Sequence, residues 1–369
     1  MIPFLIFFIL GLYIPELYSY DTAYKNYAQK NNQETAVLIV AYNRPEYFSE
    51  CIQSLEKNKE AQNIPFIFAL DGGLESKQKE NLEIIKKAKL KHKIILLRHR
   101  NYGCPKNHID AYRFVFDWCA FKKMIMVQED ILVTPTYITF ILNFHTWATT
   151  TYTNIGAVHG FSYCFLSPEE KQKKQSLIAE DNIYWLFRTF CMDSHAFHKI
   201  KPIMYRYEYF IDQIPATKEY AKMRSKPGLW DGADCIRAWM HNLIDTRSNK
   251  KNNLLSLNSS YTHMFRQEFL SKNAYVNEDN IMAFSFFMHD LVKLRSMVNR
   301  VITIGKYGIS ENSFSEVDSF DGKIILDILK NDKKIDTFYL TDDRHFFIDS
   351  TPMSSKLNQF FFDILNRAD

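Results

Sequence analysis

An apolar run that leads directly into an acidic pair is the feature that most constrains the fold. Residues Met124–Val127 are apolar, Gln128, Glu129 and Asp130 follow at once, and a second short apolar stretch ends at Pro135. Such a run is typical of a strand buried on both faces of a sheet. Open α/β sheets bind ligands beyond the carboxyl ends of their strands. The pattern therefore predicts a central strand whose tip carries ligand-binding carboxylates, although an ordinary acidic turn explains this segment alone equally well.

Three further apolar runs lie upstream, each followed by a segment with helical features. The first run ends at Asn43-Arg44-Pro45-Glu46, where a proline in the first turn and an acid beside the helix dipole favour a helix start. Consecutive strand–helix units predict an α/β fold with a mostly parallel central sheet and helices on both faces. The predicted strands before the acidic one are Thr35–Tyr42, Ile64–Leu70 and Lys93–Leu97.

Composition and missing motifs narrow the function classes. No GxGxxG follows the first strand and no GxxxxGK[ST] occurs anywhere in the 369 residues, which disfavours nucleotide-binding dehydrogenases and P-loop NTPases. A net charge of +4 without a basic stripe interleaved with aromatics argues against a nucleic-acid partner. With 46% hydrophobic and 15% aromatic residues, the chain is expected to be globular with a substantial core.

The amino-terminal residues predict entry into the secretory pathway. Residues 2–14 are nearly all apolar but fall short of the roughly 20 needed to span a bilayer comfortably. Residues 1–19 therefore suit a secretory signal cleaved after Ser19, and a short membrane anchor is the alternative. The polar residues 20–34 read as a stem or linker. The expected location is the Golgi or ER lumen, or outside the cell.

The remaining chain offers weaker signals. The six cysteines form no CxxC motif and no Cys/His cluster at zinc spacing, so those inside predicted helices are expected to be small buried side chains. Residues 280–298 form an aromatic and methionine-rich stretch that predicts a helix, and residues 301–304 predict a strand. Residues 271–369 as a whole are expected to be a small α+β extension packed on the main domain.

The order of the strand-end motifs resembles that of GT-A glycosyltransferases. Asn43-Arg44-Pro45, Asp71-Gly72-Gly73, Asn101-Tyr102-Gly103-Cys104 and Gln128-Glu129-Asp130 follow one another as in the inverting β-1,2-N-acetylglucosaminyltransferase I family and its protein-O-mannose relatives. In that family a strand ends in Glu-Asp-Asp, and a proline stands five residues after the last aspartate, as Pro135 does here. The resemblance covers residues 35–270, which implies a GT-A domain of that extent.

The resemblance also implies roles for residues at the strand ends. Asp130 falls on the family's metal ligand and would hold Mn²⁺ or Mg²⁺, while Arg44 would face the nucleotide and Asp71 would read uracil. Gln128 and Glu129 replace acids that contact sugar and ribose. His108 and Arg113, on the helix before the acidic strand, are candidates for contacts with the diphosphate. Arg44 as a solvated helix start and Asp71 as a turn residue are the structural alternatives.

The catalytic base and a second metal contact are expected further along the chain. Residues 229–240 resemble the family's Trp-Asp-Asp-Trp-Met-Arg stretch, with two extra residues between the aspartates. The base is then Asp234 or Asp231, and Asp234 is preferred because it opens the helical part; helix capping by either is the alternative. His263 is a candidate second contact to the metal or the diphosphate.

Together these features predict a metal-dependent inverting glycosyltransferase. It would move a sugar, N-acetylglucosamine by resemblance, from a UDP-sugar to a hydroxyl of a glycan or glycoprotein. One alternative is a GT-A enzyme with a different donor. A sugar-nucleotide-forming nucleotidyltransferase would need a glycine- and lysine-rich loop after the first strand, which is missing. A secreted glycan-binding protein of this fold stays open because Gln128 replaces an acid.

Overall fold

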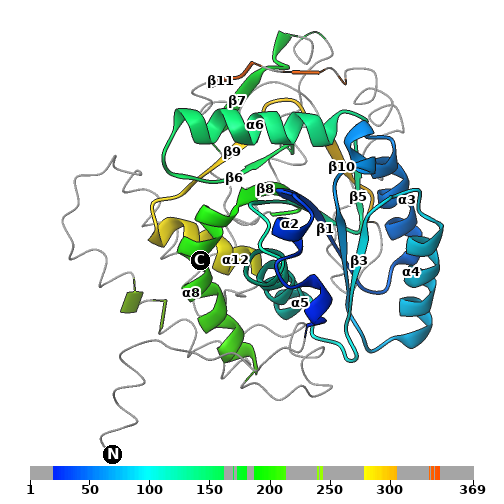
Figure 1. The fold of residues 1–369 in the computed structure, drawn as a ribbon. Helices are drawn as coiled ribbons and strands as arrows, with labels where there is room; N and C mark the ends of the chain where they lie inside the picture. The colour runs from blue at the N-terminus through cyan, green and yellow to red at the C-terminus, as the bar shows by residue number, and fades with distance from the viewer. Residues whose placement is uncertain are drawn as a thin grey trace, which may run out of the picture.

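The core of the molecule is a nine-stranded mixed sheet (Figure 1). The strand order is β11-β7-β9-β6-β8-β4-β1-β2-β3, and β4, β1, β2 and β3 run parallel. β8 is antiparallel to both of its neighbours, β4 and β6. The computed structural model describes residues 20–161, 169, 173–180, 187–212, 239–240, 242–243, 278–305, 332, 334–335 and 337–340.

The strands match the predicted ones closely in the first half of the chain. They comprise β1 Thr35–Ala41, β2 Phe66–Leu70, β3 Lys93–Leu97, β4 Lys123–Gln128, β6 Ile155–His159, β7 Leu177–Glu180, β8 Thr189–Asp193, β9 Val292–Ser296 and β11 Tyr339–Leu340. A separate antiparallel pair joins β5 Ile131–Val133 to β10 Val301–Thr303.

Helices cover both faces of the sheet, as predicted (Figure 1). Side chains of β1 alternate between two apolar layers, with Leu38 in one and Ile39 in the other, so this strand is buried on both sides. One layer contains α5 Cys104–Arg113, α8 Ser194–Asp212 and α12 Glu278–Met288; the other contains α3 Pro45–Glu56, α4 Glu75–Lys87 and α6 Tyr137–Thr151. Shorter helical turns are η1 Thr22–Tyr24, α2 Tyr27–Lys30, η2 Lys59–Gln62 and η3 Phe114–Trp118.

The segment after residue 270 differs from its prediction. The helix expected over residues 280–298 ends at Met288, and Asp290 has a positive φ of 55°, a conformation that does not continue a helix. The chain then forms β9, which lies inside the sheet between β6 and β7. The expected strand at 301–304 is present as β10. The segment thus contributes β9 and β11 to the central sheet.

The described residues include three buried cysteines and no helix that could span a membrane. Cys51, Cys119 and Cys191 are fully buried, as expected for small apolar side chains. Within the described ranges, every helix is too short or too polar to cross a bilayer. The predicted signal or anchor at residues 1–19 lies outside the described residues.

Residues 20–34 pack against the main domain rather than forming an open linker. The Asn26 N–H donates to the Trp118 carbonyl at 2.8 Å, and the Ala28 N–H donates to the Cys119 carbonyl at 2.9 Å. Ala28 is buried in the layer that contains α5. The polar composition that suggested a stem therefore belongs to a segment whose backbone hydrogen bonds attach it to η3.

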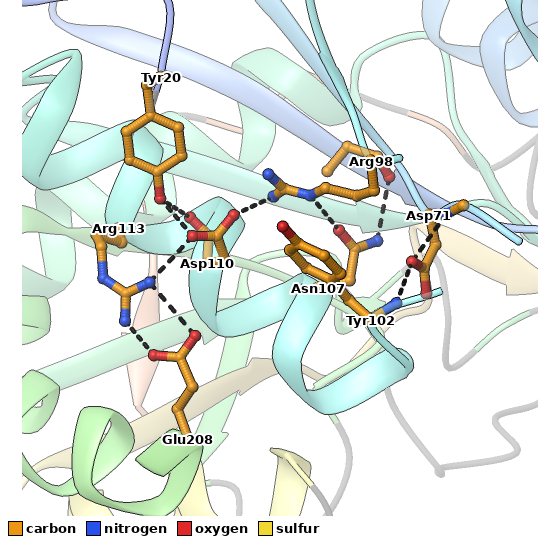
Figure 2. Close-up of polar contacts among 10 residues, drawn as sticks. Tyr20, Asp71, Arg98, Tyr102, Asn107, Asp110, Arg113 and Glu208 are labelled. Carbon is orange, nitrogen blue, oxygen red and sulfur yellow. Dashed lines mark hydrogen bonds and ion pairs between the residues drawn. The ribbon is translucent and has the colours of Figure 1, made fainter. Parts of the chain in front are cut away.

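A buried charge network fixes this segment and α5 to the rest of the domain (Figure 2). Asp110 pairs with Arg98 at 2.5 Å and with Arg113 at 3.0 Å, and it accepts a hydrogen bond from the Tyr20 hydroxyl. Arg113 also pairs with Glu208 on α8. Burial opposes the charge of Arg113, yet the pKa of its guanidinium is raised because the charge of Glu208 and its hydrogen bond outweigh that burial.

We expect Tyr20→Phe to lower the free energy of unfolding by about 1–3 kcal/mol, because it removes a donor from the buried Asp110. Tyr24→Phe is the matched control, since the Tyr24 ring also packs edge-on against Phe114 but no hydrogen bond of its hydroxyl is seen among the described residues. Urea denaturation of the three proteins measures the difference. Equal losses in both variants would show that the hydrogen bond from Tyr20 to Asp110 adds nothing specific to stability.

Candidate functional site

The carboxyl ends of two neighbouring parallel strands bring the acidic pair and Arg44 together. In the register of β1 with β4, Val40 lies opposite Gln128. The residues that follow each strand therefore emerge side by side: Tyr42 and Arg44 after β1, Glu129 and Asp130 after β4. We call Arg44, Glu129 and Asp130 the strand-tip cluster. The cluster lies beyond the carboxyl ends of these strands, where the apolar-to-acidic pattern predicted a ligand site.

Glu129 holds Arg44 in place. Its carboxylate accepts the Tyr42 backbone N–H at 2.7 Å and the Arg44 Nε–H at 2.6 Å, and only 4% of the residue is exposed. Burial raises the pKa of Glu129, and the charge of Arg44 opposes that rise. The pKa of Arg44 is raised because the charges of Asp130 and then Glu129 outweigh its burial. Glu129 is thus a positioning residue for the guanidinium.

One carboxylate oxygen of Asp130 is paired with Arg44, and the other has no hydrogen-bond partner among the described residues. Its Oδ2 accepts a hydrogen bond from Arg44 Nη1 at 3.0 Å, whereas Oδ1 is buried and has no hydrogen-bond partner among the described residues. A buried carboxylate oxygen without a donor is costly unless a cation or water completes it. Mn²⁺ and Mg²⁺ take few protein carboxylates and keep waters or phosphate oxygens as their other ligands. The Asp130 side chain therefore fits the divalent cation that the sequence predicts.

Gly305 covers the strand-tip cluster, which the sequence did not predict. β10 pairs with β5, and the next residue, Ile304, donates its N–H to the Asp130 carbonyl at 2.9 Å. A Cβ at Gly305 would lie 2.2 Å from Asp130 Oδ2 and 3.0 Å from Arg44 Nη1. Only a residue without a side chain can approach the two groups so closely. The scarcity of glycine in this chain was the one available signal.

Gly305→Ala should therefore displace Asp130. We expect a loss of stability of about 1–3 kcal/mol from the added methyl group and a fall of about 100-fold in any activity that uses Asp130, since small misplacements have such effects. Gly156→Ala is the matched control, because its Cβ would meet the Phe286 ring at 2.6 Å, in the core. Urea denaturation measures the stability of both variants, and hydrolysis of a nucleotide sugar measures their activity. Equal activity in both variants would remove Gly305 from the site.

Asp71 stabilises a loop by accepting hydrogen bonds from backbone N–H groups. Its two oxygens accept the backbone N–H groups of Gly72 at 2.9 Å, Tyr102 at 2.7 Å and Gly103 at 3.0 Å (the Tyr102 contact is drawn in Figure 2). Burial raises the pKa of Asp71, and these three donors oppose the rise. The carboxylate thus fixes the loop between β3 and α5. This arrangement matches the turn alternative, and the role in reading uracil stays a prediction.

His108 and Arg113, the two predicted diphosphate contacts, lie against α12 and α8. Arg113 lies in the buried network with Asp110 and Glu208, and that ion pairing explains its place on α5. His108 is 3% exposed and lies against Cys104 at the start of α5. The contacts seen for these two side chains do not include the strand-tip cluster. α5 turns both residues toward α8 and α12, and their role as diphosphate contacts stays a prediction.

Other predicted residues are partly located. Gln128 is half-buried at the end of β4, and its N–H donates to the Arg188 carbonyl at 3.1 Å. The candidates for the catalytic base, Asp231 and Asp234, and for the second metal contact, His263, lie outside the described residues. Their roles stay predictions.

Comparisons with known proteins give structural neighbours only. No family model and no curated protein sequence matches the chain. S. aureus TarS 1–349 aligns with 65% of this chain and 70% of its own at 13% identity and a TM-score of 0.37. Mouse xyloside xylosyltransferase 1 aligns over 70% and 83% at 7% identity and 0.35. A Pyrobaculum calidifontis mannosyltransferase, in complex with GDP-Man and Mn²⁺, aligns over 78% and 93% at 10% identity and 0.32. Another alignment spans only 30% of the TarS chain.

Proposed function

We propose that this protein is a GT-A glycosyltransferase that uses a nucleotide-sugar donor and a divalent cation held by Asp130. The observation that carries the proposal is the buried Asp130 carboxylate at the tip of β4, with one oxygen paired to Arg44 and the other without a partner among the described residues. The order of strand-end motifs in the sequence supports the same reading.

Each residue of the strand-tip cluster has a chemical task in this proposal. A bound Mn²⁺ or Mg²⁺ supplies positive charge that stabilises a departing diphosphate. Arg44 donates charge-assisted hydrogen bonds to phosphate oxygens, for which its planar guanidinium is suited. Its side chain is 24% exposed, so it can reach a ligand while Glu129 holds its Nε. The Tyr47 ring, 5.7 Å from the Arg44 guanidinium carbon, limits where that group can move.

The finer features of the reaction rest on the sequence resemblance. The proposed donor is a UDP-sugar, with N-acetylglucosamine as the sugar, and the acceptor is a hydroxyl of a glycan or glycoprotein. Asp234, or otherwise Asp231, would take the acceptor's proton during a single inverting displacement. General-base assistance of this kind contributes about 10²- to 10⁴-fold to the rate. The proposed place of action is the lumen of the secretory pathway.

A donor-binding panel tests the proposal. The full chain is heated with UDP-, GDP- and CDP-sugars, each with and without Mn²⁺, and the melting temperature is recorded. Binding restricted to the folded state raises it. We expect at least one donor to raise the melting temperature, and more strongly with Mn²⁺. If no nucleotide sugar has any effect while a panel of free glycans does, the protein is a glycan-binding protein and the transferase proposal fails.

A further inference from the structure

Three metal-binding side chains meet where α5 and α12 begin. Cys104 is the first residue of α5, His108 lies one turn later, and Glu278 is the first residue of α12. The Cys104 Sγ lies 3.5 Å from His108 Nδ1 and 2.8 Å from Glu278 Oε1. One donor atom from each side chain lies within 4.8 Å of the others. We call these residues the Cys–His–Glu cluster.

The His108 ring is arranged as in a zinc-binding histidine. Its Nδ1 lies 2.7 Å from the Cys104 carbonyl oxygen, and since that oxygen can only accept, Nδ1 carries the proton. The lone pair is then on Nε2, which is buried and has no hydrogen-bond partner among the described residues, so a metal would bind His108 through Nε2, whereas the 3.5 Å approach to Cys104 Sγ is made by Nδ1. Zinc-binding histidines commonly donate their other ring N–H to a backbone carbonyl in this way.

The surroundings of the cluster favour a cation. Cys104 and Glu278 both stand in the first turn of a helix, where the dipole stabilises a thiolate and a carboxylate. Glu278 is only 7% exposed, and Asp279 lies beside it. A carboxylate as buried as that of Glu278 is costly unless a hydrogen-bond donor or a cation accompanies it.

We propose that Cys104, His108 and Glu278 bind Zn²⁺. Thiolate, imidazole and carboxylate are the ligand types that zinc takes, whereas Mg²⁺ and Mn²⁺ prefer oxygen alone. Three protein ligands leave one tetrahedral position for water. The site is distinct in chemistry from the oxygen site at Asp130 and goes beyond the proposed transferase function. Because Cys104 and Glu278 are 174 residues apart, the ion would connect α5 to α12 and stabilise the folded chain.

The test is metal binding by the full chain, which does not depend on nucleotide-sugar binding. The protein is freed of metal with a chelator and titrated with Zn²⁺, and with Co²⁺ as a spectroscopic probe. We expect equimolar zinc uptake, a rise in melting temperature, and a sulfur-to-cobalt charge-transfer band in the near ultraviolet. Mn²⁺ should not displace the cobalt. Absence of zinc uptake and of the band in the folded wild-type chain would overturn the proposal.

Variants assign the ligands. Cys104→Ala should abolish the charge-transfer band and weaken zinc binding by more than about 100-fold, since even changes beyond the ligands weaken it by about 10- to 100-fold. Cys119→Ala is the matched control, because Cys119 is buried outside the cluster, and it should keep the band. If Cys104→Ala does not fold, Glu278→Gln provides the comparison. This variant keeps the Cys104 thiol and a side chain of the same size at position 278. It should weaken zinc binding while the charge-transfer band persists. A band that survives in Cys104→Ala, or undiminished affinity in Glu278→Gln, would contradict this ligand set.

Discussion

Asp130→Asn is expected to lower Mn²⁺-dependent turnover of the nucleotide sugar by about 10²- to 10³-fold, the loss typical when one preorganised electrostatic group is removed. Asparagine keeps the size of the side chain, so the fold should be retained. The substitution replaces one carboxylate oxygen by an NH₂ group. It removes the negative charge that Arg44 and the cation would share. Donor hydrolysis at a fixed Mn²⁺ concentration measures the effect.

The control for this variant is an ion-paired aspartate outside the strand-tip cluster. Asp117 pairs with Lys201 at 2.9 Å and accepts a hydrogen bond from Tyr205 at 2.6 Å. Asp117→Asn should leave turnover unchanged. If both asparagine variants lose turnover equally, the effect comes from stability. If neither loses it, Asp130 has no role in the reaction.

Glu208→Ala should be the most destabilising of the substitutions considered, at about 3–5 kcal/mol, the usual loss when one partner of a buried ion pair is removed. Glu208 is fully buried, and Arg113 is 6% exposed. Among the described residues, Asp110 would be the remaining ion-pair partner of the Arg113 guanidinium, and Asp110 is already shared with Arg98 and Tyr20 (Figure 2). Urea denaturation at neutral pH measures the change.

An exposed ion pair provides the comparison for Glu208→Ala. Glu83 and Lys86 are 2.6 Å apart on α4, and their side chains are 56% and 67% exposed. Glu83→Ala should leave the midpoint of urea denaturation essentially unchanged, because solvent screens such pairs. A similarly small effect for Glu208→Ala would mean that the buried network does not hold α5 against α8.

The sequence predicted the parallel half of the sheet well because its signals are local. The apolar runs of β1, β2 and β4 are buried on both faces, while β3 at the edge of the sheet exposes Ile95 and Leu97, and each run can be recognised within a short stretch of sequence. The juxtaposition of Arg44 with Glu129 and Asp130 follows from the pairing of β1 with β4, which a short stretch of sequence does not specify. β9 was missed because the apolar residues of 280–298 do not distinguish a buried helix from a buried strand.

The rest of the site depends on contacts between distant segments. Nothing near His108 indicates Glu278, and nothing near Arg113 indicates Glu208, because each partner comes from a helix far along the chain. The observation that the cysteines form no Cys/His cluster at zinc spacing considered the sequence alone, so it could not include Glu278 on α12. Gly305 reaches Asp130 only because β10 pairs with β5.

The most direct test is a crystal structure of the full chain with UDP and Mn²⁺, using anomalous scattering to locate the manganese. The account predicts a manganese peak within about 2.0–2.6 Å of an Asp130 carboxylate oxygen, the range for hard divalent cations, with diphosphate oxygens on the same ion. A manganese–nucleotide complex bound away from Asp130, or UDP bound with the Arg44–Asp130 pair intact and no manganese beside it, would contradict the account.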